Sequence, residues 1–137
     1  MGKPNVTAAL TLPDYFTRCV GIELLDGLHK KSLELITAYS DSEWAADRRS
    51  QGLNCPEISY VKDDFIENYE QWVSQASIIF ANATCFEPDM LEKVSTFLRI
   101  RFEPGQVFIL TTKELDVPDE DFIKVGPLVR RMSWGET

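Results

Sequence analysis

ASIIFANATCFEPDMLEKVSTFLRIRFEPGQVFILTT, residues 76–112, is the stretch of sequence that indicates the fold. Its first six residues are nearly all apolar, which is typical of a strand buried on both faces. Pro88 suits the first turn of a helix. The apolar face of that helix consists of Leu91, Val94, Phe97 and Leu98. Pro104 and Gly105 end the helix, and residues 106–112 predict a second buried strand. Strand, helix and strand in this order predict a right-handed crossover between parallel strands.

The residues before this stretch show the same alternation. Residues 18–23 form a short apolar run, and from Leu25 apolar side chains recur at helical spacing, with Asp26 available as the N-cap. Residues 58–62 form the next run, and a second helical pattern follows it. The apolar face of that pattern consists of Phe65, Tyr69, Trp72 and Val73. One of the two aspartates that precede this face is expected to cap its helix.

The alternation predicts an α/β fold, Rossmann-like, with a mainly parallel sheet and helices on both faces. We expect a single domain over residues 1–137, because the chain is long enough for one core and too short for two. Residues 40–54 are polar, and Gly52 and Asn54 suggest a break there. Residues 128–134 are expected to add one antiparallel strand. In such sheets, ligands bind outside the carboxyl ends of the strands.

Composition and charge narrow the class of protein. The net charge of −8 argues against strong direct nucleic-acid binding and suits a basic protein partner, such as a lysine-rich tail. No apolar run approaches the roughly 20 residues of a membrane span, and the N-terminus lacks the apolar segment of a signal peptide. We therefore expect no membrane and an intracellular protein of the nucleus or cytoplasm. Three separated cysteines and the lone His29 indicate reduced thiols and no zinc site.

Polar side chains follow the predicted strands at their carboxyl ends. They are Glu23, then Asp63 and Asp64, then Asn82, then Thr112 and Lys113. A strand-end acid in a nucleotide-binding sheet accepts hydrogen bonds from both ribose hydroxyls. An acid followed by an aromatic residue, such as Asp64 with Phe65, suits an adenine amino group with the ring packed on the base. Asn82 offers both a donor and an acceptor.

Each of these residues also has an ordinary structural interpretation. Glu23 suits a solvated loop, Asp64 a helix cap, Phe65 a core position and Asn82 a turn. Their joint order in this fold favours the ligand-binding interpretation.

The segments Gly21-Ile-Glu23, Asp63-Asp-Phe65, residues 80–94 and residues 104–113 resemble, in this order, the core of the class I methyltransferases that use S-adenosyl-L-methionine. More narrowly, they are similar to the histone lysine methyltransferases of the Dot-one type, which lack a SET domain. The resemblance extends from Gly2 to about residue 134. It implies a protein lysine methyltransferase with S-adenosyl-L-methionine as cofactor and a basic protein such as a histone as substrate.

The resemblance also implies roles for single residues. Glu23 would hold the ribose, Asp64 would contact the adenine amino group, and Phe65 would lie beside the adenine ring. Asn82 would lie near the methionine moiety and the entrance of the lysine channel, as the residue closest to catalysis. The end of the glycine-rich cofactor loop falls on Gly2 and Lys3, and the helix that follows that loop falls on residues 1–10.

The sequence departs from the family at three places. Of the glycine-rich turn it has only the last glycine, Gly2, so the resemblance implies an incomplete domain without the usual first strand and inactive as this fragment. Ala83 and Thr84 replace the residues that follow the family's asparagine. The chain also ends before the family's channel tyrosine. A missing central strand leaves unpaired sheet edges, through which two copies of the chain can form a homodimer.

Two other interpretations remain open. One is a methyltransferase-like protein-interaction module without catalysis, in which a partner or a second copy replaces the missing strand. The other is a nicotinamide-dependent oxidoreductase, against which the Asp64–Phe65 pair and Asn82 speak.

Overall fold

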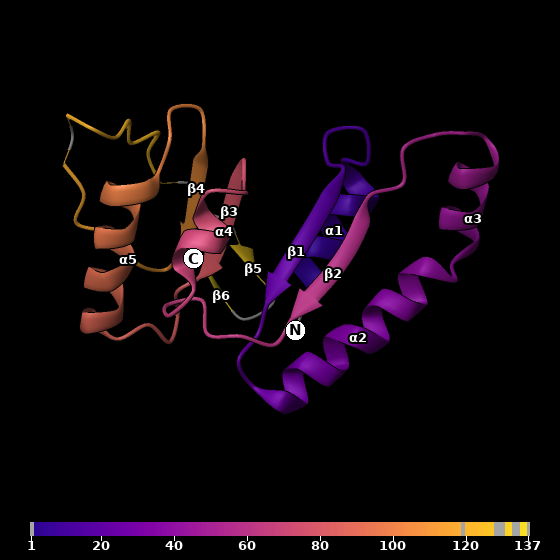
Figure 1. Cartoon of the computed structure of the whole chain (residues 1–137), viewed down its shortest axis with the longest axis horizontal. Helices are drawn as coiled ribbons and strands as arrows, with labels where there is room; N and C mark the ends of the chain where they lie inside the picture. The colour runs from indigo at the N-terminus through magenta and orange to yellow at the C-terminus, as the bar shows by residue number, and fades with distance from the viewer. Residues whose placement is uncertain (1, 119, 128–130, 133–134, 137) are drawn as a thin grey trace. The chain divides into compact units, whose positions relative to one another are not determined.

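The computed structural model describes residues 2–118, 120–127, 131–132 and 135–136. It is a mixed α/β structure with short parallel sheets. Contacts divide the chain into two compact units, residues 1–65 and 66–137, and each is described by itself (Figure 1). The expected single Rossmann-like domain therefore stays a prediction.

The first unit contains one parallel strand pair and three helices. Its elements are α1 (Lys3–Thr11), β1 (Arg18–Ile22), α2 (Asp26–Ser40), α3 (Glu43–Ser50) and β2 (Glu57–Val61). The pairing of β1 with β2 is parallel and runs from Arg18 opposite Glu57 to Ile22 opposite Val61. Helix α1 packs against both strands, and α2 packs against β2 (Figure 1). The predicted parallel pairing across a helical crossover is confirmed here.

The core of the first unit lies between its strands and helices. Its buried members are Ala9, Cys19, Tyr39, Ile58 and Tyr60. Ile58 and Tyr60 alternate along β2, so both side chains project from the same face of the strand. The hydroxyl of Tyr39 donates a 2.9 Å hydrogen bond to the carbonyl of Pro56, which satisfies its polar atom within the core.

Tyr60 occupies the space beside two glycines. It lies opposite Gly21 across the strand pair, and a Cβ atom at Gly21 would overlap the Tyr60 ring. A Cβ atom at Gly2 would overlap the hydroxyl end of the same ring, and that hydroxyl donates to the Gly2 carbonyl. The absence of a side chain at both glycines is therefore required by the packing of Tyr60.

The second unit contains another parallel pair joined by a helical crossover. Its elements are α4 (Tyr69–Val73), β3 (Ile78–Asn82), α5 (Pro88–Arg101), β4 (Val107–Thr111), β5 (Arg131–Met132) and β6 (Gly135–Glu136). The pairing of β3 with β4 runs from Ile78 opposite Val107 to Asn82 opposite Thr111, as residues 76–112 predicted. Short strands β5 and β6 pair antiparallel. The antiparallel strand expected over residues 128–134 falls partly on β5, and its other residues lie outside the described part of the chain.

One face of the β3–β4 pair is exposed. Its four large apolar side chains, called the apolar face below, are Ile78, Phe80, Val107 and Ile109, each 44–47% exposed. The alternate side chains of both strands are half-buried. Burial of residues 76–81 on both faces was predicted and is wrong for Ile78 and Phe80, because no described element of the second unit covers this side.

The break that Gly52 and Asn54 suggested is confirmed, because α3 ends at Ser50 and Gly52 has a φ angle of 68°. The sequence did not predict α3 itself, whose N-cap Ser42 accepts a 3.2 Å hydrogen bond from the amide of Ala45.

Two local predictions are wrong. Helix α2 begins at Asp26 itself, with Leu25 as N-cap, and the Asp26 side chain forms an ion pair with Lys62. No aspartate caps the helix after β2, since α4 begins only at Tyr69.

Among the described residues, no helix is both long enough and apolar enough to cross a membrane.

The Tyr60–Gly21 contact generates the first prediction. Gly21→Ala forces a methyl group against the Tyr60 ring, and overpacking of this kind lowers the free energy of unfolding by about 1–3 kcal/mol. Gly27→Ala is the matched control, because nothing lies within 4 Å of a Cβ atom at Gly27 in α2. Urea unfolding measures both variants. Equal stabilities of Gly21→Ala and Gly27→Ala would contradict the packing role of Tyr60.

The second prediction concerns the pH dependence of stability and follows from three buried groups, the thiol of Cys19 and the hydroxyls of Tyr39 and Tyr60. Burial raises the pKa of Cys19, the pKa of Tyr39 and the pKa of Tyr60, the last to about 12. Above the ordinary pKa values of these groups the unfolded chain loses protons that the folded chain keeps, so stability present at neutral pH falls as pH rises. For Tyr60 the loss of stability falls mainly between pH 10, its ordinary pKa, and pH 12, because burial raises its pKa to about 12.

Urea unfolding at increasing pH, with tyrosinate absorbance recorded in parallel, checks this dependence. In Tyr60→Phe the alkaline loss of stability becomes shallower. An identical slope in wild type and Tyr60→Phe would show that Tyr60 does not contribute.

Candidate functional site

In the first unit, acidic side chains follow both strands at the same edge. The amide of Glu23 donates a 3.0 Å hydrogen bond to the carbonyl of Val61, which continues the pairing of β1 and β2 by one step. Asp63 and Asp64 follow β2 directly beyond this point. Because the two strands are parallel and in register, Glu23 and the two aspartates lie at the carboxyl edge of one sheet.

Local hydrogen bonds orient two of these carboxylates. Glu23 Oε1 accepts a 3.0 Å hydrogen bond from the amide of Leu25, at the start of α2. Asp63 Oδ1 accepts a 2.8 Å hydrogen bond from the amide of Asp64. Glu23, Asp63, Asp64 and Phe65 are all half-buried, so their side chains are partly accessible to a ligand.

A positive charge lies close to the same edge. Lys62, the last residue before the aspartates, forms an ion pair with Asp26 at the start of α2. The hydrogen bond and charge of Lys62 lower the pKa of Asp26. This pair links the end of β2 to α2 beside Glu23.

Gly2 and Lys3 lie at the start of α1, on a different part of the first unit. Gly2 packs against Tyr60, as described above. Lys3 is exposed and lines a cavity of about 200 Å³ together with Lys31, Glu34, Leu35 and Ala38 of α2. Its lining residues all come from α1 and α2, as in an ordinary gap between two helices.

In the second unit, Asn82 ends β3 within a group of threonines. Its Oδ1 atom accepts hydrogen bonds from Thr84 Oγ1 at 2.7 Å, from Thr111 Oγ1 at 3.1 Å and from the Thr84 amide at 3.2 Å. Thr111 is the cross-strand partner of Asn82, so the two side chains lie on the same face of the sheet. The four side chains of the apolar face lie on this same side of the sheet.

Thr112 adds backbone strain at this position. Its φ angle of 66° lies in the left-handed region, which a β-branched residue rarely adopts. The conformation lets Thr112 Oγ1 donate a 2.6 Å hydrogen bond to the carbonyl of Thr111 and places it 3.3 Å from Thr84 Oγ1. Strained residues of this kind are concentrated at functional sites. Nothing in the sequence pattern predicted this conformation.

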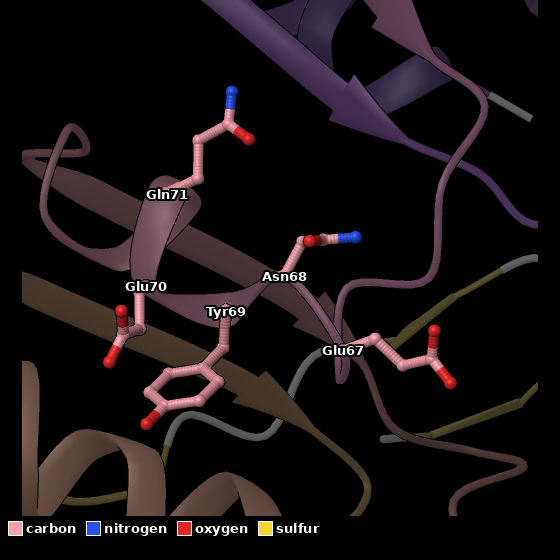
Figure 2. Close-up of a pocket in the computed structure, with 5 residues that line it drawn as sticks. All are labelled: Glu67, Asn68, Tyr69, Glu70 and Gln71. Atoms are coloured by element: carbon pink, nitrogen blue, oxygen red, sulfur yellow. The ribbon is translucent and has the colours of Figure 1, made fainter.

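A second hollow lies beside α4 and has a volume of about 460 Å³. It is lined by five consecutive residues, Glu67 to Gln71, whose side chains diverge (Figure 2). Tyr69 stacks on Phe97 with ring centroids 3.7 Å apart, and Glu70 pairs with Arg101 at 2.5 Å. Two of the five side chains contact α5, and the five do not point toward a common centre, so they do not form a binding site together.

Within the described part of the chain, no group of three or more His, Cys, Asp or Glu side chains is placed to hold a metal ion. Cys19, Cys55 and Cys85 are free cysteines, of which Cys19 is buried and Cys85 is exposed.

The predicted site residues therefore fall in both units. Glu23, Asp64 and Phe65 share one edge of the first unit, and Gly2 and Lys3 lie at the start of α1 in that unit. Asn82 belongs to the second unit. Sequence analysis named Thr112 as a strand-end residue but did not predict that Thr84 and Thr111 are hydrogen-bond partners of Asn82.

Comparison with known proteins adds no relative: the chain matches no protein-family model, and a search of curated proteins finds no significant match.

Proposed function

We propose that this chain belongs to an S-adenosylmethionine-dependent methyltransferase that acts on protein lysine, such as a histone lysine. The observation that carries the proposal is the placement of Glu23 and Asp64 after neighbouring parallel strands, at one sheet edge. Ligands of parallel α/β sheets bind at this edge. Glu23 is proposed to accept hydrogen bonds from the ribose hydroxyls, and Asp64 to accept one from the adenine amino group.

Other residues support the proposal to different degrees. Phe65 follows Asp64 directly and is half-buried, which suits a ring packed beside adenine. Asn82 offers an oriented amide at the carboxyl end of β3. Gly2 and Lys3 contribute least, because the space beside the Gly2 α-carbon is filled by Tyr60 of the same chain.

S-adenosylmethionine, when bound, supplies a methyl group already activated by its positive sulfur. A lysine ammonium would first lose a proton to solvent. The neutral amine would then take the methyl group as the carbon–sulfur bond breaks, which would leave a methylammonium and a neutral thioether. The protein has to bind, orient and exclude water. We assign binding roles to Glu23, Asp64, Phe65 and Asn82, and no residue is assigned as a base. The net charge of −8 suits a basic protein substrate.

Calorimetric titration with S-adenosylhomocysteine tests this proposal. We expect micromolar binding, which Glu23→Ala and Asp64→Ala each weaken by roughly tenfold or more, because each removes a charged hydrogen-bond acceptor. Glu57→Ala is the matched control, since Glu57 is an exposed acid at the opposite end of β2. We expect its affinity to equal that of wild type.

Three results would oppose the proposal. They are no binding by the wild-type chain, an equal loss in the Glu57→Ala control, and tighter binding of NADH than of S-adenosylhomocysteine. The last result would favour the oxidoreductase interpretation.

The apolar face favours a second candidate, a protein-interaction module without catalysis. Four large apolar side chains on one side of a two-stranded sheet form a patch of the kind that marks interaction sites. Among the described strands, β3 pairs only with β4, which leaves one edge of β3 open. Open edges and apolar faces both favour pairing with a second copy of the chain or with another protein.

Sedimentation velocity at increasing protein concentration tests self-association. We expect a dimer fraction that Phe80→Thr and Ile109→Thr each reduce, because a hydroxyl replaces apolar area on the shared face. Ile100→Thr is the control, since Ile100 is 58% exposed on α5 and lies outside this face. A monomer at every concentration, or an equal effect of Ile100→Thr, would exclude a dimer through the apolar face.

A further inference from the structure

We infer that residues 122–125 of one copy of this chain, called the exposed segment below, pack on the apolar face of a second copy. The second copy packs its own exposed segment on the first in the same way, so the two copies form a symmetric dimer. The inference rests on the second candidate function, because it names the partner of the same apolar face. It uses contacts of the second unit alone.

The exposed segment is anchored at two alternate positions. The ring of Phe122 stacks on Phe102, at the C-terminal end of α5, with ring centroids 5.8 Å apart. Lys124 forms a 3.0 Å ion pair with Glu114, in the loop that follows β4. Two side chains of the segment are therefore engaged with the rest of the second unit.

The other two side chains of the segment have no cover. Ile123 is 94% exposed and Val125 is 96% exposed, more than any other large apolar residue in the described part of the chain. They alternate along the sequence with the two anchored residues, as side chains on the two sides of a strand do. A single exposed apolar residue needs no explanation, but two at alternate positions of an anchored segment form one apolar surface.

The apolar face has the spacing to receive this surface. On each of β3 and β4, two of its side chains lie two positions apart, and the register of the strands sets them side by side in two cross-strand pairs. Side chains two positions apart on a strand are about 6.6–6.8 Å apart. Ile123 and Val125 are also two positions apart, so an extended segment has the same repeat as the face.

Within one copy these two surfaces do not meet. Ile123, Val125 and the four residues of the apolar face are all exposed in the same chain. The contacts of Phe122 and Lys124 keep the segment at the end of α5 and at the loop after β4. Each copy therefore offers one apolar face and one apolar segment, and a twofold axis satisfies both at once.

The buried area favours this arrangement over two apolar faces that pack on each other. A fully exposed Val, Ile or Phe residue offers about 170–240 Å², so the four partly exposed residues of the apolar face offer about 370 Å² per copy. Two such faces bury about 740 Å² in total, which is less than the roughly 1,000 Å² of a specific interface. With Ile123 and Val125 of both copies the apolar area rises to about 1,400 Å², within the range of stable interfaces.

Sedimentation velocity of the full chain tests the role of the segment. We expect Ile123→Thr/Val125→Thr to weaken the dimer by roughly tenfold or more, because less apolar area is removed from water. The matched control is Ile123→Val/Val125→Ile, which keeps the apolar area and should dimerise like wild type. An equal dimer fraction in wild type and Ile123→Thr/Val125→Thr would overturn the inference.

Disulfide cross-linking tests whether the segment packs on the other copy. Cys85 is exposed, so Cys85→Ser is the parent chain, and it should not cross-link. One chain then carries Ile123→Cys and another carries Ile109→Cys. On mixing, we expect disulfide-linked dimers of the two different chains in excess over dimers of either chain alone. An excess of Ile109→Cys dimers, or an intrachain disulfide in the chain that carries both substitutions, would overturn the inference.

The two experiments separate this inference from the second candidate function. If the wild-type chain is a monomer at every concentration, both fail together. If Phe80→Thr weakens the dimer but Ile123→Thr/Val125→Thr does not, the apolar face is an interface and the inference alone fails. The methyltransferase proposal is unaffected in either case, because the titration with S-adenosylhomocysteine tests it separately.

Discussion

Parallel strand pairing across a helical crossover is the constraint on which the rest of this structure depends. In an antiparallel pair, the carboxyl ends of the two strands lie at opposite edges of the sheet. In a parallel pair, both carboxyl ends lie at the same edge. The register of β1 with β2 therefore brings Glu23 close to Asp63 and Asp64, which are about 40 residues further along the chain. The register of β3 with β4 likewise sets Asn82 beside Thr111. Both candidate sites follow from this single geometric rule.

Short two-stranded sheets also explain the exposed features of the molecule. Two strands offer few side chains for burial on each face, so one layer of helices covers only part of the apolar area. In the first unit, Tyr60 compensates by lying over Gly21 and against Gly2, which joins α1 to the strand pair. In the second unit no described residue does the same, and Ile78, Phe80, Val107 and Ile109 remain exposed. The two units therefore pair their strands in the same way but differ in which side chains cover the strands.

The carboxyl edges of the two strand pairs differ in their chemistry. Glu23 and Asp64 offer carboxylate oxygens, which are hydrogen-bond acceptors. Asn82 presents a donor, because its oxygen is already engaged by threonines. The acceptors come from residues that the sequence marks clearly, whereas the donor depends on contacts that form only in the folded chain.

The sequence by itself determined the order and type of most elements. Apolar runs and helical spacing are local signals, so β1, α2, β2, β3, α5 and β4 could be predicted from them. The same signals placed Glu23, Asp64 and Asn82 at strand ends. Helix α3 was missed, because its stability depends on the Ser42 cap and on the buried Ala45 more than on an apolar stripe.

Only the tertiary structure decided how the strand-end residues are held. The hydroxyl of Thr111 reaches Asn82 across 29 positions of sequence, and Tyr60 reaches Gly2 across 58. Neither contact has a local signal, because both depend on which strands become neighbours and in which register. Exposure of the apolar face also depends on the tertiary structure, because the sequence of an apolar strand is the same whether one of its faces is covered or both are. Local patterns therefore identify elements, while contacts between distant segments determine the direction in which a functional side chain points.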